Sequence, residues 1–180
     1  MDAARLRLCS WGIALTSGAS LMLSLLFTRM FSVTMFYHFA FLLVSLAMLG
    51  IAVSGVVIYL LPRVFAPERR LLLAGVFAVA IAPLALLAMR VTVHSPLTLD
   101  LQSQNLIRLL KLYAVTSLPF LASGFAISLV IASAGKHIGR VYAFDLLGAA
   151  AGCVVIIPLT PRLSAPGAVV AAAALAALGG

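Results

Sequence analysis

Charge is scarce in this 180-residue sequence, and acidic charge is the scarcest. Charged residues make up 9% of the chain, with four Asp or Glu against twelve Lys or Arg, while 64% of the residues are hydrophobic. This composition excludes an ordinary soluble domain of this length, because a single core cannot hide so much apolar side chain. We therefore expect lipid to be the solvent around most of the chain.

Cysteine and histidine are also few, and their positions argue against metal and redox chemistry. Cys9 and Cys153 stand alone in apolar runs with no CxxC pair, so neither a disulfide framework nor a zinc site is expected. His38, His94 and His137 lie in separate connections, where no two of them have the spacing that places two ligands on one helix face. We expect neither a metal nor a cofactor in these residues.

Long apolar runs separated by basic residues dominate the sequence. A helix that spans a bilayer needs about 20 apolar residues, and cutting the chain at its charges leaves six segments. They lie near 9–27, 39–61, 71–89, 112–134, 141–159 and 166–180. The sequence therefore predicts a single all-α domain over residues 1–180, a polytopic transmembrane bundle of about six helices. The sixth segment reaches Gly180 without a basic anchor, which favours a chain that continues beyond it.

The basic residues are spread singly or in pairs between the apolar runs, which indicates topology signals and not a nucleic-acid surface. On the two alternate sides of the predicted bundle they number seven and five. The larger group is Arg5, Arg7, Arg63, Arg69, Arg70, Lys136 and Arg140, and the smaller is Arg29, Arg90, Arg108, Lys111 and Arg162. The positive-inside rule then places both termini in the cytoplasm.

Two connections carry features of the membrane surface. Aromatic residues crowd the link between the first two spans, where we expect them at the lipid headgroups; they are Phe27, Phe31, Phe36, Tyr37, Phe39 and Phe41. The connection from Arg90 to Lys111 has apolar residues at nearly helical spacing in its second half. That pattern fits either an amphipathic helix lying on the membrane or a solvated loop that leads into the fourth span.

Asp145 is the sharpest candidate for a functional side chain, because it is the only acidic residue inside an apolar span. An ionisable group at mid-bilayer costs about 2.5–3.5 kcal/mol on insertion scales, so it should face protein or water. One interpretation makes Asp145 a contact for a proton, a cation or a substrate amine, with Arg140 and Tyr142 beside it. The other makes it an anchor that pairs with Arg140 or Lys136, or that accepts a hydrogen bond from another helix.

Small residues follow Asp145 on the same segment. Gly148 and Gly152 form a GxxxG pattern with three alanines between them. Because bare backbone lets a neighbouring helix approach closely, this pattern predicts a helix-packing surface. The hydroxyl residues of the first span predict further packing, with the lining of a cavity as the alternative.

Two stretches resemble the membrane part of bacterial membrane-integrated spermidine synthase-like proteins. Residues 36–42 (FYHFAFL) and 45–50 (SLAMLG) are similar to the second-helix region of that family. Residues 138–149 (IGRVYAFDLLGA), with Gly152 and Pro158 after them, are similar to its fifth-helix region, and residues 166–168 to the start of the next helix. The resemblance implies a major-facilitator-like half in the bacterial inner (plasma) membrane, followed by a soluble domain similar to aminopropyltransferases.

The catalytic features of that family are absent from this sequence. Neither a glycine-rich cofactor loop after a strand nor the acidic residues that would bind an aminopropyl donor and a polyamine amine occur here, so no enzyme activity is assigned to these residues. We expect a membrane domain that anchors or feeds a C-terminal catalytic domain. The alternative is half of a secondary transporter for a small metabolite, cationic if Asp145 contacts it, that works with a second helical half. Both place the chain in a lipid bilayer, and neither involves nucleic acid.

Overall fold

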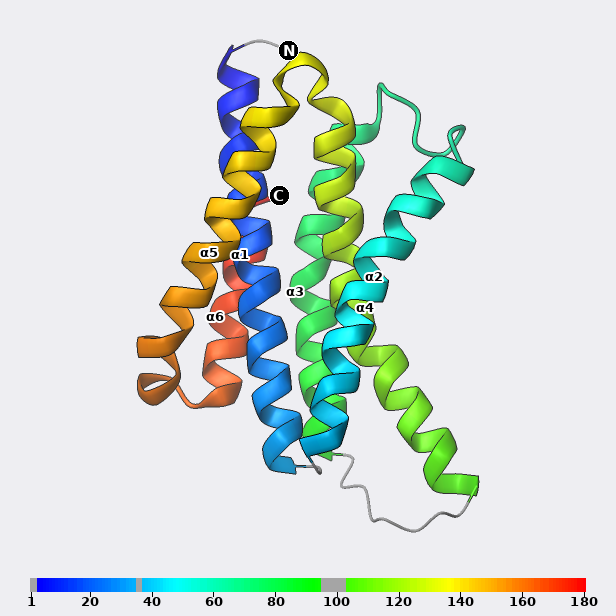
Figure 1. The fold of residues 1–180 in the computed structure, drawn as a ribbon, viewed down its shortest axis with the longest axis vertical. Coiled ribbons are helices and arrows are strands. Elements are labelled where there is room, and N and C mark those ends of the chain that lie inside the picture. Colours follow the sequence, from blue (N-terminus) through cyan, green and yellow to red (C-terminus); the bar gives the residue numbers. More distant parts are fainter. Residues whose placement is uncertain (1–2, 35–36, 95–102) are drawn as a thin grey trace.

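A computed structural model describes residues 3–34, 37–94 and 103–180 (Figure 1). Its elements are α1 (Ala3–Thr34), α2 (Tyr37–Leu60), α3 (Arg70–His94), α4 (Ser103–Ser133), the short 3₁₀ helix η1 (Gly135–His137), α5 (Ile138–Arg162) and α6 (Ala165–Leu178). All regular structure in the described residues is helical. The predicted all-α bundle of six helices is therefore confirmed.

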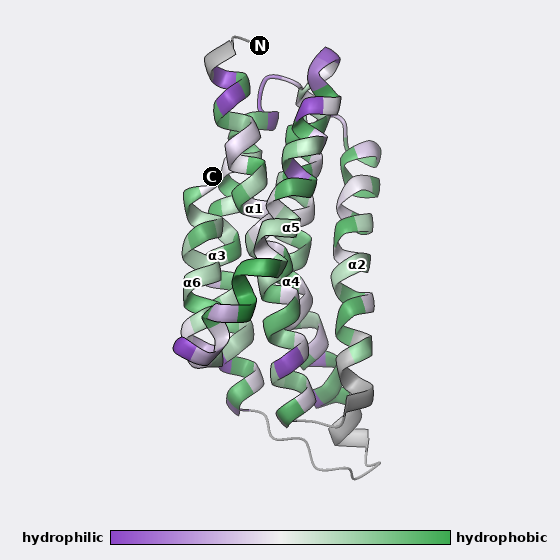
Figure 2. Cartoon of the chain, turned by 60° about the vertical axis from the view of Figure 1, so that its left-hand side comes forward, coloured by the Kyte–Doolittle hydropathy of each residue, from purple (hydrophilic) through white to green (hydrophobic). Residues whose placement is uncertain are grey.

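Five of these helices are long and apolar enough to cross a membrane. The candidate spans are Arg5–Val33, Leu43–Leu60, Arg70–His94, Ile107–Ser133 and Gly135–Arg162. Figure 2 shows apolar residues along the middle of the helices and hydrophilic residues concentrated near the two ends of the bundle. This distribution is that of a bundle surrounded by a bilayer.

The last helix, α6, is the exception. It has 14 residues, which gives a length of about 21 Å at 1.5 Å per residue, against a hydrocarbon core of about 30 Å. A helix does form over the sixth predicted segment, 166–180, and within the described residues it is shorter than the hydrocarbon core is thick. Pro166 lies in the first turn of α6, where its missing N–H costs no helical hydrogen bond.

The helix α4 begins earlier than the sequence predicted. Residues 103–111, in the second half of the long connection, form its first turns and continue into the span without a break. The solvated-loop alternative is therefore wrong for these residues; the helix predicted there forms, as the first turns of α4. Residues 95–102 of the same connection lie outside the described residues.

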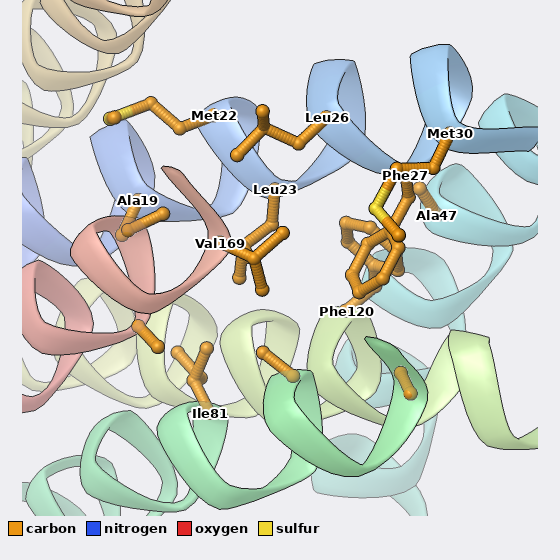
Figure 3. Packing of buried hydrophobic residues seen from close by; sticks show 14 of the residues in the cluster. Ala19, Met22, Leu23, Leu26, Phe27, Met30, Ala47, Ile81, Phe120 and Val169 are labelled. Carbon is orange, nitrogen blue, oxygen red and sulfur yellow. The ribbon is translucent and has the colours of Figure 1, made fainter. Parts of the chain in front are cut away.

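The helix α1 occupies the centre of the bundle. It packs against α2, α4, α5 and α6, while α3 packs against α4 and α6. Leu23 of α1, Ile81 of α3 and Val169 of α6 share one hydrophobic core (Figure 3). A central helix must carry apolar or small residues on most of its faces, and this explains why α1 combines large aliphatic side chains with glycine and serine.

Two of the aromatic residues predicted at the headgroups lie in this core instead. Phe27 and Phe31 are fully buried. Phe27 meets Phe120 of α4 edge-on at 6.3 Å between ring centroids (Figure 3), and Phe31 stacks on Tyr113 at 5.9 Å. The headgroup prediction is wrong for both, because α1 runs through the bundle and turns these rings toward α4.

The rest of that aromatic cluster is only partly described. Phe41 is exposed at 71% of its surface, as expected for a ring that faces lipid or its interface. Phe36 lies outside the described residues, as do the side chains of Tyr37 and Phe39.

Candidate functional site at the α1–α5 seam

The helices α1 and α5 run parallel and touch through bare backbone. A Cβ atom added at Gly18 would lie 2.8 Å from the carbonyl oxygen of Gly148. One added at Gly148 would collide with the backbone of Ala14, and one at Gly152 with the backbone of Gly18. The GxxxG pattern of α5 thus faces a matching small pair, four residues apart, on α1. Such surfaces gain van der Waals contact that lipid cannot supply.

Asp145 lies beside this seam, half-buried, in the first third of α5. Its carboxylate oxygen Oδ1 accepts a hydrogen bond from the hydroxyl of Ser17, which is buried on α1. A carboxylate in a membrane span is stabilised by such a donor, because lipid offers none. The partner of Asp145 is thus a side chain of the neighbouring helix, one of the arrangements considered from the sequence.

Arg140 and Tyr142 do not join Asp145 in one site. Among the described residues, neither a hydrogen bond nor an ion pair connects Asp145 to either of them. Both side chains are exposed. The guanidinium carbon of Arg140 lies 6.0 Å from the centroid of the Phe144 ring, within the range of a cation–π contact.

A second aromatic ring completes this outer arrangement. Trp11 of α1 meets Phe144 edge-on, with centroids 5.5 Å apart and the ring planes at 76°. Trp11, Phe144 and Arg140 thus form a row of contacts that crosses from α1 to α5 in the first turns of both helices. The sequence did not predict this contact between Trp11 and Phe144, because it does not show that α1 and α5 are neighbours.

The hydroxyl groups of α1 are hydrogen bonded within the bundle. Ser20 pairs with Ser123 of α4 at 3.0 Å between the two Oγ atoms, and Ser10 and Thr16 donate to carbonyl oxygens one turn earlier in α1. Within the described residues, every buried side-chain nitrogen or oxygen has a partner. These hydroxyls therefore support helix packing.

A small cavity lies between α1, α3, α4 and the end of α6. Its volume is about 150 Å³, and its lining is largely apolar, with Thr16 as the hydroxyl residue in it. Ligand sites for small molecules commonly measure about 300–1,000 Å³. This space is therefore small for a polyamine or a metabolite of similar size.

A second close contact joins α2 and α4. A Cβ atom added at Gly124 would lie 2.8 Å from the Cα atom of Ile51, and one at Gly50 would lie 3.0 Å from the backbone nitrogen of Leu121. The sequence analysis did not predict this contact between Gly50 of α2 and Gly124 of α4. The signal that could have found it is the small pair Ser123 and Gly124 inside an otherwise bulky span.

No group of three or more metal-binding side chains occurs in the part of the chain that the structure describes. Cys9 and Cys153 are both free thiols. Comparisons with protein families, curated proteins and solved structures find no match. The similarity to spermidine synthase-like membrane domains therefore stays a prediction from the sequence.

Proposed function

We propose that residues 1–180 form a membrane domain that holds a spermidine synthase-like catalytic domain at the cytoplasmic face of the bacterial inner membrane. The observation that carries this proposal is the packed interior. The seams of α1 with α5 and of α2 with α4 are backbone contacts, and within the described residues the cavity between α1, α3, α4 and α6 has a volume of about 150 Å³. A bundle built this way suits a rigid anchor, because substrate passage needs a wider polar path.

The orientation of the bundle in the membrane is inferred from its basic residues. Arg5, Arg7, Lys136 and Arg140 are exposed at the end of the bundle where α1 and α5 begin, and the positive-inside rule assigns such an end to the cytoplasm. A soluble domain that acts on cytoplasmic polyamines would have to lie on that side.

The test is made on the full natural reading frame that encodes this chain. We expect a soluble domain with a glycine-rich nucleotide loop to follow, and we expect aminopropyl transfer to a polyamine to sediment with the membranes. Replacing residues 1–180 with an unrelated helical bundle of known topology is the control, and it should keep both activity and sedimentation. A reading frame without such a domain would overturn the proposal.

The contact between Asp145 and Ser17 favours a second candidate function, half of a transporter for a small cationic metabolite. A half-buried carboxylate at a seam of two parallel helices can bind a proton or an amine when the seam opens. The measurement is uptake of a labelled polyamine into proteoliposomes. Asp145→Asn should abolish uptake, whereas Glu68→Gln, which alters an exposed acid outside the spans, should retain it. Absence of uptake by the unaltered protein would eliminate this candidate.

A further inference from the structure

An apolar groove of about 460 Å³ runs along the outer side of the α1–α5 seam. Its lining extends from Trp11 to Met22 on α1 and from Phe144 to Val155 on α5, and Leu175 of α6 contributes to it. Each helix therefore contributes 11 residue steps, which at 1.5 Å per residue make the groove about 16 Å long. The hydrocarbon of one leaflet is about 15 Å deep, half of the bilayer core.

The mouth of this groove carries aromatic and basic side chains in a matched arrangement. On α1, Arg7 lies four residues before Trp11; on α5, Arg140 lies four residues before Phe144. Residues four apart share one face of a helix, and the two helices begin at the same end of the bundle. Two exposed guanidinium groups are therefore placed about one turn beyond the ring pair that begins the groove.

Positive charge dominates this mouth. Arg5 and Lys136 are exposed at the same end of the bundle. Among the described residues, the acidic residue nearest to the ring pair in the sequence is Asp145, which is not part of the groove lining and accepts a hydrogen bond from Ser17. A ligand that fits both parts of the site must therefore combine an anionic head with a long apolar tail.

We propose that this groove binds one anionic phospholipid of the leaflet that surrounds the start of α1. One acyl chain lies against the small residues between α1 and α5, and the phosphate lies between Arg7 and Arg140. Clusters of basic residues at the ends of membrane helices attract anionic lipids by about 1 kcal/mol per side chain. A second protein helix fits the groove less well for two reasons. The glycines of α5 already contact the backbone of α1 and so are not free to pack against another helix. An apolar helix would also leave the arginines at the mouth without an anionic partner. The inference is independent of what the bundle anchors or transports.

Trp11 is the only tryptophan of the chain and lines the groove, so its fluorescence reports directly on the occupant. The purified chain is reconstituted in vesicles of phosphatidylcholine with a minor fraction of phosphatidylglycerol. In one sample the phosphatidylglycerol carries brominated acyl chains, and in the other an equal amount of phosphatidylcholine carries them. Bromine quenches tryptophan only at close range, and we expect stronger quenching by the brominated phosphatidylglycerol.

Two sets of variants, three at arginines and two at alanines, distinguish a specific lipid site from general attraction to the membrane. Arg140→Gln and Arg7→Gln should each lower the preference for phosphatidylglycerol about fivefold, whereas Arg162→Gln at the other end of α5 should leave it unchanged. Ala151→Leu fills the groove and should weaken quenching, while Ala150→Leu, which alters an exposed neighbour outside the lining, should not. Having both arginine variants keeps the test decisive if one fails to fold.

Three results would overturn the proposal. Equal quenching by the two brominated lipids would show that the groove does not select the anionic head. An equal loss on Arg162→Gln would show that net charge alone sets the preference. Weak quenching by both lipids, together with cross-linking between copies through a cysteine introduced at Ala151, would show that a second copy of the chain covers the groove.

Discussion

The hydroxyl of Ser17 is the polar group that stabilises Asp145 inside the membrane span. In water, the Ser17 hydroxyl and the Asp145 carboxylate could each form hydrogen bonds with solvent, whereas lipid offers neither group a hydrogen-bond partner. Measured hydrogen bonds between membrane helices are nevertheless modest, averaging about 0.6 kcal/mol, because the unfolded chain in the membrane also finds partners. The contact thus fixes how α5 is rotated against α1 more than it stabilises the fold.

A double-mutant cycle tests this contact. We expect Ser17→Ala and Asp145→Asn to show a coupling free energy of about 0.6 kcal/mol, measured by unfolding in mixed detergent micelles. Ser10→Ala is the matched control, because Ser10 is also buried on α1 but donates to the carbonyl oxygen of Leu6 in its own helix. Coupling of Asp145→Asn with Ser10→Ala as strong as with Ser17→Ala would contradict the assignment.

The seam between α1 and α5 explains why glycine is required at two positions of α5. Gly148 and Gly152 are buried against backbone atoms of Ala14 and Gly18, so a methyl group at either glycine cannot be accommodated by a side-chain rotation. The helices would have to separate, and the contact with Trp11 and Phe144 at the mouth of the groove would change with them.

Gly148→Ala should therefore destabilise the bundle by about 1–3 kcal/mol, the usual cost of overpacking a close-packed interior. Gly55→Ala is the control, because a Cβ atom at Gly55, in the last third of α2, would have no neighbour within 4 Å. Replacing that glycine should be neutral or slightly stabilising, since alanine is the better helix former. Thermal unfolding in detergent compares the two, and equal effects would argue against a tight α1–α5 seam.

Hydropathy predicted the cores of five spans within a few residues, because the requirement for about 20 apolar residues per crossing is strong and local. Hydropathy predicted the helix ends less well, because α1 continues past Arg29 and α4 starts at Ser103. A basic residue need not end a helix, since its long side chain can extend toward the headgroups while its backbone stays helical. It could not show which helices are neighbours. The pairing of Ser17 with Asp145 and the burial of Phe27 depend on that arrangement.

At the scale of the whole molecule, α6 reverses the direction of α5 and runs back along the bundle (Figure 1). Five crossings place the end of α5 on the side opposite to the start of α1, and α6 then turns back along α1 and α3. A Cβ atom at Gly12 of α1 would lie 2.6 Å from the carbonyl oxygen of Gly179. Residue Gly179 is therefore beside the upper part of α1, well inside the length of the bundle (Figure 1).

Labelling of introduced cysteines with a membrane-impermeant maleimide tests this topology. In a background with Cys9→Ser and Cys153→Ser, we expect Lys136→Cys and Ser164→Cys to react from opposite sides of the membrane. The two exposed positions lie just before and just after the helix α5, so they form a matched pair whose difference depends only on whether α5 crosses. The positive-inside rule assigns position 136 to the cytoplasm, and it should react only in inverted vesicles, whereas position 164 should react in intact cells. Labelling of both from one side would mean that α5 does not span.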